Sequence, residues 1–166
     1  ASAPESVRPL IVRDTLRPGL FAPERFSLVC GFQVLDHLLD PNACLAACRE
    51  ALAPGGVMYW VCHDADAPVS RLLGRRSPIV DIEHAVLYSR ATARRLFEQN
   101  GFEVAEVFGV ANRYPLGYWA RMAPLPPRIK APLLRLLDRA GPGRWRLRAN
   151  FGNMGIVAVK PRQPML

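Results

Sequence analysis

The spacing of apolar residues in the first half of the chain predicts two strands joined by a helix. Phe26–Gly31 is a short apolar run rich in strand-forming residues, and Val57–Cys62 is apolar on both faces, as expected of an interior parallel strand. Between them, Asp40 followed by Pro41 is a typical helix start, and an apolar stripe at helical spacing follows, formed by Cys44, Ala47, Cys48 and Ala51. Two strands with a capped helix between them predict a βαβ unit.

The rest of the pattern predicts further elements before and after this unit. Three more strands are predicted, at Val7–Val12, Phe102–Val110 and Met154–Lys160. Two more helices are predicted, a short one at Pro68–Gly74 and one that Ser89 caps and that runs to Asn100. A long Pro-rich segment separates the last two strands, and it contains one amphipathic helix, Arg128–Ala140.

Composition places the chain among globular proteins that fold around a core. Its 166 residues are 50% apolar and 22% charged, which argues against global disorder and favours one domain. A run of about 20 apolar residues, which a bilayer span needs, is absent, and the first thirty residues lack a secretory pattern. The four cysteines show no C-x-x-C spacing, so we expect buried, reduced thiols and a cytoplasmic protein.

Positive charge is concentrated in the Pro-rich segment. The chain has 22 basic and 14 acidic residues, a formal net charge of +8. From residue 113 to 148 the only acid is Asp138, against nine basic residues: Arg113, Arg121, Arg128, Lys130, Arg135, Arg139, Arg144, Arg146 and Arg148. This segment is either a solvated surface or a field that attracts anionic lipid, an acidic substrate or nucleic acid. Aromatic and basic residues interleave too sparsely to favour RNA.

The chain contains three stretches whose order and spacing form a recognisable arrangement. They are FSLVCGFQVLDHLLDP from Phe26, the following LAPGG and VMYWV, and DIEHAVLYSRATARRLFEQNGFEV from Asp81. Together they resemble the class I S-adenosylmethionine (SAM)-dependent methyltransferases of the small-molecule group. The resemblance implies an α/β fold, an incomplete Rossmann-like methyltransferase sheet of parallel strands plus a C-terminal antiparallel strand pair, with helices on both faces. Residues 1–166 would form one partial methyltransferase domain, with the basic Pro-rich insertion at about 113–150.

One part of that family's pattern is absent from the sequence. The family's glycine-rich loop, Gly-x-Gly-x-Gly after its first strand, holds the methionine end of SAM, but the twelve glycines here never take that spacing. The resemblance therefore implies that Val7–Val12 is the family's third strand and that the chain is the C-terminal portion of a longer protein, inactive alone. Without its usual neighbours, Val7–Val12 is expected to be either loose or moved beside Phe26–Gly31, because an unpaired strand edge is unfavourable.

The resemblance places the residues that bind SAM after two of the strands. Asp14, Thr15 and Leu16 follow the family's third strand, where the family contacts adenine; the alternative is a surface aspartate in a turn. The other candidates, expected on the methionine and ribose side, are Gly31, Phe32 and Gln33. They end the family's fourth strand, and ligands of open α/β sheets bind at the carboxyl ends of parallel strands. Phe32 is equally compatible with a position in the core.

His84 and His37 are the candidate catalytic residues. His84 matches the family's histidine after the fifth strand, over the acceptor pocket, and is either a base or substrate contact or the partner in a structural hydrogen bond. His37 matches the histidine of the family's Glu-His pair and is a base, a substrate contact or a residue that orders its own loop. Some relatives bind a divalent cation through an E-x-x-E-H run, but Gln33 replaces its first carboxylate, so no metal is expected. His63, just past a strand, is a candidate for the border of the crevice.

Two functions fit these patterns. The first is the C-terminal portion of a cytoplasmic SAM-dependent methyltransferase acting on a small molecule, with an acceptor pocket built by His37, His84 and the aromatic segment Tyr114–Met122. The second is a non-catalytic methyltransferase-like module that binds a partner, an anionic membrane or RNA through its basic insertion. Residues 128–140 are then the candidate for peripheral membrane contact. The sequence indicates neither the acceptor nor the oligomeric state.

Overall fold

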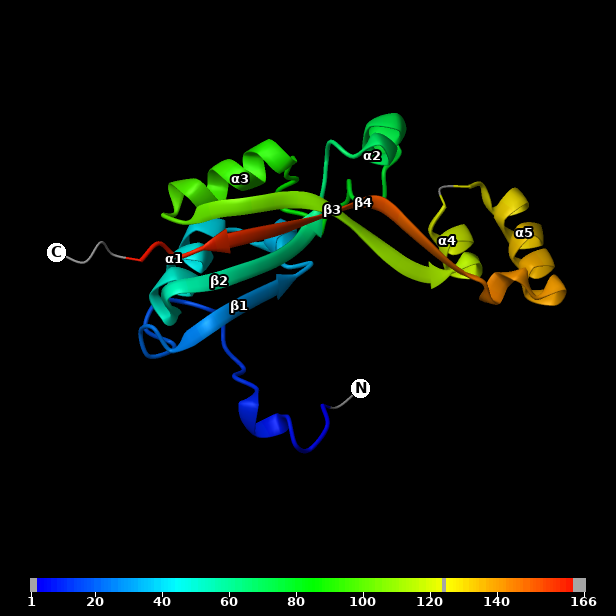
Figure 1. Ribbon diagram of the computed structural model, residues 1–166. Coiled ribbons are helices and arrows are strands. Elements are labelled where there is room, and N and C mark those ends of the chain that lie inside the picture. The colour runs from blue at the N-terminus through cyan, green and yellow to red at the C-terminus, as the bar shows by residue number, and fades with distance from the viewer. Residues whose placement is uncertain (1–2, 124, 163–166) are drawn as a thin grey trace.

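The computed structural model describes residues 3–123 and 125–162, and its centre is a mixed sheet (Figure 1). Within that range four strands pair in the order β1-β2-β4-β3, with β1 Phe26–Phe32, β2 Leu52–His63, β3 Glu103–Pro115 and β4 Arg146–Val159. β1 and β2 are parallel, and β4 runs antiparallel to both β2 and β3. The predicted parallel strands and C-terminal antiparallel pair are therefore confirmed, within a Rossmann-like α/β fold.

The two long predicted helices of the α/β unit form where their capping residues indicate. α1, Pro41–Ala51, begins after Asp40, whose side chain accepts a hydrogen bond from the Ala43 N–H. α3, Arg90–Gln99, begins after Ser89, which forms a reciprocal capping box with Thr92. Such caps satisfy N–H groups that the first helical turn leaves without partners. The short predicted helix is also present as α2, Pro68–Leu73.

The core lies between the sheet and one pair of helices. Met58, Trp60 and Cys62 point from β2 toward α1 and α3, where Leu45 and Phe97 meet them. The rings of Trp60 and Phe97 make an edge contact with centroids 6.1 Å apart. Burial of this apolar surface is the main source of stability for the unit.

Helices cover one face of the sheet in the described range, which corrects the expectation of helices on both faces. α1 and α3 lie side by side, and the Asn100 side chain at the end of α3 donates to Asn42 in α1. On the opposite face Leu28 is 54% exposed and Phe32 59%. The physical reason is that crossovers between parallel strands are right-handed. Both crossovers here, from β1 to β2 and from β2 to β3, move in the same direction across the sheet, so both helices fall on the same side.

The first described residues do not form the predicted strand. Val7–Val12 is exposed and contains a 3-10 turn, η1 Arg8–Leu10, whose first turn includes Pro9. The strand prediction was wrong because Pro9 lies inside the apolar run, favours a turn and removes a donor that a ladder would need. Of the two expected positions, the loose one is found, and Figure 1 shows this segment away from the sheet while β1 forms its edge.

The Pro-rich segment is held on a two-stranded ribbon. β3 and β4 stay paired as far as Pro115 and Arg146, well beyond the predicted strand ends at Val110 and Met154. The ribbon carries α4, Leu116–Met122, and α5, Pro127–Ala140, followed by η4, Pro142–Arg144 (Figure 1). The ribbon's outer half has no buried face, so its strands show no apolar alternation to detect. We call α4, α5 and η4 the helical unit.

No helix in the described ranges is both long and apolar enough to cross a membrane.

Candidate functional site

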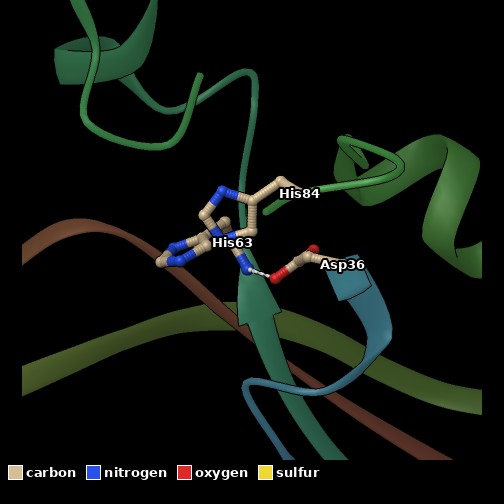
Figure 2. Close-up of side chains that lie close together, drawn as sticks. All are labelled: Asp36, His63 and His84. Carbon is tan, nitrogen blue, oxygen red and sulfur yellow. Dashed lines mark hydrogen bonds between the residues drawn. The ribbon is translucent and has the colours of Figure 1, made fainter. Parts of the chain in front are cut away.

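Three titratable side chains from separate segments meet at the carboxyl ends of β1 and β2. Asp36 comes from η2, Leu35–His37, His63 ends β2, and His84 lies in the loop that precedes α3 (Figure 2). One ligand atom from each of them lies within 4.8 Å of the others. This is the edge of an open α/β sheet where ligands bind. We call these three residues the Asp-His cluster.

Asp36 is the buried member of the cluster. Its side chain is 0% exposed, and its Oδ2 accepts a hydrogen bond of 3.1 Å from the His63 backbone N–H. Oδ1 is buried and has no hydrogen-bond partner among the described residues. Burial raises the pKa of Asp36, against the opposing effects of the His63 N–H and the nearby histidines.

His63 and His84 form the other side of the cluster. Their ring centroids are 4.9 Å apart and the rings are nearly perpendicular. Burial lowers the pKa of His63, although the charge of Asp36 and a hydrogen bond with the Asn153 side chain oppose it. His84 Nδ1 lies 3.0 Å from Asp81 Oδ1, but the angle is not that of a hydrogen bond. The Asp81 carboxylate is held in place by the backbone N–H groups of Glu83 and His84.

His37 joins the cluster's loop to the segment that carries His84. Its Nδ1 lies 2.8 Å from the Glu83 carbonyl oxygen, and its ring stacks at an angle on that of His84, with centroids 4.7 Å apart. A carbonyl oxygen only accepts, so Nδ1 donates this hydrogen bond. The contact fits the alternative in which His37 orders its loop, and a role as base or substrate contact stays a prediction.

Buried contacts hold the His84 segment against the end of β2. Asp64 is almost fully buried, and its carboxylate accepts a hydrogen bond of 2.9 Å from Arg90 in α3. The Ala65 N–H donates to the Tyr88 carbonyl, and the Val86 N–H donates to the Asp36 carbonyl. These bonds hold the segment that carries His84 against the end of β2.

The three predicted cofactor residues after β1 lie at the crevice but face different ways. Gly31 points toward the core, where a Cβ atom would lie 2.7 Å from the Trp60 ring, so close packing requires glycine there. Phe32 is exposed on the helix-free face, beside Tyr59, and is not a core residue. Gln33 has φ +52° and donates through Nε2 to the Asn153 side chain, 3.0 Å away.

The predicted adenine contacts lie elsewhere in the described structure. Asp14 accepts hydrogen bonds from the Thr15 N–H and the Arg17 side chain, as a turn aspartate does. Thr15 is exposed, and Leu16 is half-buried against the edge of the core. The structure does not bring these three residues to the crevice with Gln33, and their role with SAM stays a prediction.

A cavity of about 490 Å³ opens beside the Asp-His cluster. His63, Gln33 and Asn153 lie at one side of it, and its other walls are largely apolar: Val69, Leu73, Pro78, Ile79, Tyr114, Tyr118, Trp119 and Met122. The predicted aromatic segment of the acceptor pocket therefore shares a cavity with His63, and not with His37 or His84, the two histidines predicted to build that pocket. Asn153 and Asn112, which also line it, carried no signal in the sequence. A more open hollow near Lys160 lies at the other end of the sheet, and no histidine lines it.

Comparison with known proteins identifies the family to which this chain belongs. Residues 4–107, well over half of the chain, match the family model described as a methyltransferase domain. A ubiquinone biosynthesis O-methyltransferase of Cereibacter sphaeroides is 54% identical over 47 residues, which are 28% of this chain and 19% of that protein. The chain thus matches about a fifth of that curated relative.

Solved structures agree on the fold. A SAM-dependent methyltransferase of Thermotoga maritima superposes with a TM-score of 0.56 at 16% identity, over 89% of this chain and 62% of that one. The [4+2]-cyclase SpnF superposes with a TM-score of 0.52 at 15% identity, over 87% of this chain and 53% of that one. A fold shared with a cyclase does not identify a reaction. On the match over residues 4–107, the chain belongs to the methyltransferase domain family.

Proposed function

We propose that this chain forms the acceptor-binding portion of a SAM-dependent methyltransferase that methylates an oxygen of a small aromatic molecule. The observation that carries the proposal is the cavity lined by aromatic and aliphatic side chains that opens onto His63 of the Asp-His cluster. Family membership and the position of the cluster at the carboxyl ends of β1 and β2 support it.

The described residues fit SAM at one wall of the crevice. Phe32 and Gln33 are exposed beyond the end of β1, where the donor would lie across the strand ends. The glycine-rich motif of the resemblance has no counterpart in the sequence. We therefore propose that the chain acts as part of a longer protein and does not transfer methyl groups alone. The donor, when bound, supplies a methyl group that its sulfonium has already activated.

The protein's own task is to hold the acceptor, exclude water and remove a proton. When the acceptor's hydroxyl oxygen gains the methyl group, its proton passes to an imidazole nitrogen and then to solvent. His84 is largely shielded from solvent, and the ring of His37 packs against it, so these two are the candidates to accept that proton. Because burial lowers the pKa of His63, this ring stays neutral near neutral pH and adds no positive charge beside the base.

The cavity walls favour a flat acceptor with an apolar substituent. Tyr114, Tyr118 and Trp119 form mutual edge and tilted contacts at 4.4 to 5.8 Å, which gives one wall several aromatic faces and edges. The similarity to ubiquinone biosynthesis O-methyltransferases supports an oxygen as the methylated atom.

Calorimetry and a methyl-transfer assay test the proposal. This chain should bind SAM weakly or not at all, whereas a longer version that adds the upstream coding sequence should bind it with a micromolar-range Kd, about −8 kcal/mol. The longer version should then methylate ortho-dihydroxybenzenes with apolar tails, followed with SAM carrying a labelled methyl group. Donor binding without transfer to any phenolic acceptor would contradict the proposal.

A second function rests on a different observation, and we propose it for the helical unit. Ile129 and Leu136 on α5, and Trp145 just after η4, are all more than half exposed and lie among basic residues. An exposed apolar face bordered by arginine is typical of helices that lie on anionic bilayers. Such contact would place the cavity beside a source of apolar acceptors. Flotation with anionic and with zwitterionic vesicles tests it: only the anionic vesicles should carry the protein.

A further inference from the structure

The Asp-His cluster offers the donor set of a metal centre. Two imidazoles and one carboxylate converge from three segments, with ligand atoms within 4.8 Å of one another (Figure 2). Three protein ligands that leave further positions open are the pattern of catalytic zinc, and two histidines with one carboxylate also bind Fe²⁺. We propose that Asp36, His63 and His84 bind a first-row divalent transition-metal ion, such as Zn²⁺ or Fe²⁺, beside the acceptor cavity.

Asp36 provides an observation that points to a ligand independently of the clustering. Its side chain is fully buried, and one oxygen, Oδ2, is fixed by the His63 N–H, while Oδ1 has no partner in the described structure. A buried polar atom without a partner costs about 1–3 kcal/mol, and more where the group is charged. A cation bound to Oδ1 would remove that cost and compensate the charge.

Groups behind the two histidines match what surrounds metal-bound imidazoles. A metal-ligating histidine usually donates its second ring N–H to a carboxylate, carbonyl or amide oxygen, which fixes the ring. His63 has a hydrogen bond with the Asn153 side chain, and His84 has the Asp81 carboxylate 3.0 Å from its Nδ1. Asp81 is in turn fixed by two backbone N–H groups. The His63 ring is therefore held by a hydrogen bond, and a fixed carboxylate lies beside the His84 ring.

The site needs a small adjustment to close around an ion. Ligand atoms at about 2.1 Å from a tetrahedral zinc lie about 3.4 Å apart, which is closer than the 4.8 Å spread here. The Asp36 carboxylate is already held by the His63 N–H, so the adjustment would fall on the two imidazoles. Asp36 is the one ligand that this donor set shares with the run Gln33–His37, and both imidazoles come from outside that run.

The chemical role of the ion rests on the proposed methyl transfer, whereas its binding does not. His63 belongs both to the cluster and to the cavity lining, so an open coordination position would face the acceptor. An acceptor hydroxyl bound there would lose its proton more easily, since a divalent cation lowers the pKa of a bound oxygen. The released proton would then pass to a neighbouring base, and His37, whose ring lies against that of His84, is the candidate.

Titration of the purified chain with Co²⁺, a spectroscopic substitute for Zn²⁺, tests the inference. We expect one equivalent to bind with visible absorption bands of a low-symmetry site, and Zn²⁺ to displace it. Asp36→Asn and His84→Gln should each lower the affinity at least 100-fold, and Asp81→Asn, behind the ligands, about 10- to 100-fold. Asp66→Asn, the matched control at an exposed carboxylate outside the cluster, should bind Co²⁺ like the wild type.

Thermal unfolding separates lost binding from lost folding. Excess Zn²⁺ should raise the melting temperature of the wild type by mass action but not that of Asp36→Asn or His84→Gln, whose metal-free melting should show a cooperative transition. Absence of stoichiometric binding, or binding that survives both substitutions, would overturn the inference. If a longer version binds the metal but methylates no phenol, the proposed function is contradicted and the metal site is supported. If it methylates a phenol without binding a metal, the metal site is contradicted and the proposed function is supported.

Discussion

The sheet with α1 and α3 and the helical unit at the end of the ribbon use apolar residues in opposite ways. In the former, Phe97 and Ile156 are fully buried, whereas in or beside the helical unit Leu136 is 63% exposed and Trp145 71%. The two regions also differ in charge, since the excess of basic residues lies in the Pro-rich segment. The comparison teaches that apolar residues in the first region supply stability, while those in the second are available for a ligand or surface.

The largest effect should come from removing a core ring. Phe97→Ala should lower the free energy of unfolding by about 3–5 kcal/mol, because it leaves a cavity against Trp60 and Phe102. Leu136→Ala, the matched change in the helical unit, should stay within about 0.5 kcal/mol of the wild type, because the side chain is mostly exposed. Urea unfolding measures both. Similar losses in the two variants would break the comparison.

The next effect should appear at a membrane surface and only for the helical unit. Each basic residue near an anionic bilayer contributes about 1 kcal/mol, so Arg135→Glu with Arg139→Glu should weaken vesicle binding about 25-fold or more. Co-sedimentation with phosphatidylglycerol vesicles measures it. The matched control, Arg8→Glu with Arg95→Glu, makes the same charge change on exposed residues outside the helical unit. If both pairs weaken binding equally, general charge and not the helical unit is responsible.

A smaller effect is expected at the helix cap of the packed region. Ser89→Ala removes the hydrogen bond from the Thr92 N–H and half of the capping box. The free energy of unfolding should fall by about 1 kcal/mol, which thermal unfolding detects. Ser89→Asp, which can still accept that bond, should recover most of the loss. No loss in the alanine variant would show that α3 is held by its apolar contacts alone.

The smallest effect on the free energy of unfolding is expected at Asp36, in the Asp-His cluster between the two regions. Without metal, Asp36→Asn should raise the free energy of unfolding by about 1 kcal/mol at neutral pH, because a neutral amide replaces a buried carboxylate. Burial raises the pKa of Asp36 in the folded state above its unfolded value of about 3.9. The contribution of the protonated side chain to the free energy of unfolding is therefore complete below about pH 3.9, and it is lost as the pH rises through the pKa of the folded state. The gain should therefore vanish near pH 4. Urea unfolding at both pH values decides; an equal difference at each would contradict the raised pKa.

Local signals in the sequence were sufficient to predict the helices of the packed α/β region. Asp40 with Pro41, and Ser89 with the later Gly101, predicted helix ends to within one or two residues, because caps depend on neighbours in the chain. The strand predicted at Val7–Val12 failed because Pro9 within the apolar run favours a turn and cannot donate to a ladder. The ribbon ends were missed for a different reason, since an exposed strand pair leaves no apolar pattern.

The candidate site was only partly predictable from sequence. His84 and His37 were singled out through the family resemblance, and the structure brings their rings together. Asp36 and His63 are 27 positions apart, and their contact depends on the parallel register of β1 and β2. Asn153 comes from the last strand, so its place behind His63 follows only from the full sheet order. Local patterns carry no information on such long-range contacts.

The most direct test of the account is the rate of methyl transfer in the longer version of the protein, compared between wild type and His84→Gln. If the Asp-His cluster handles the acceptor's hydroxyl, kcat should fall about 10²- to 10⁴-fold in the variant while the Kd for SAM stays the same. A variant that turns over at the wild-type rate would show that the cluster takes no part in the reaction.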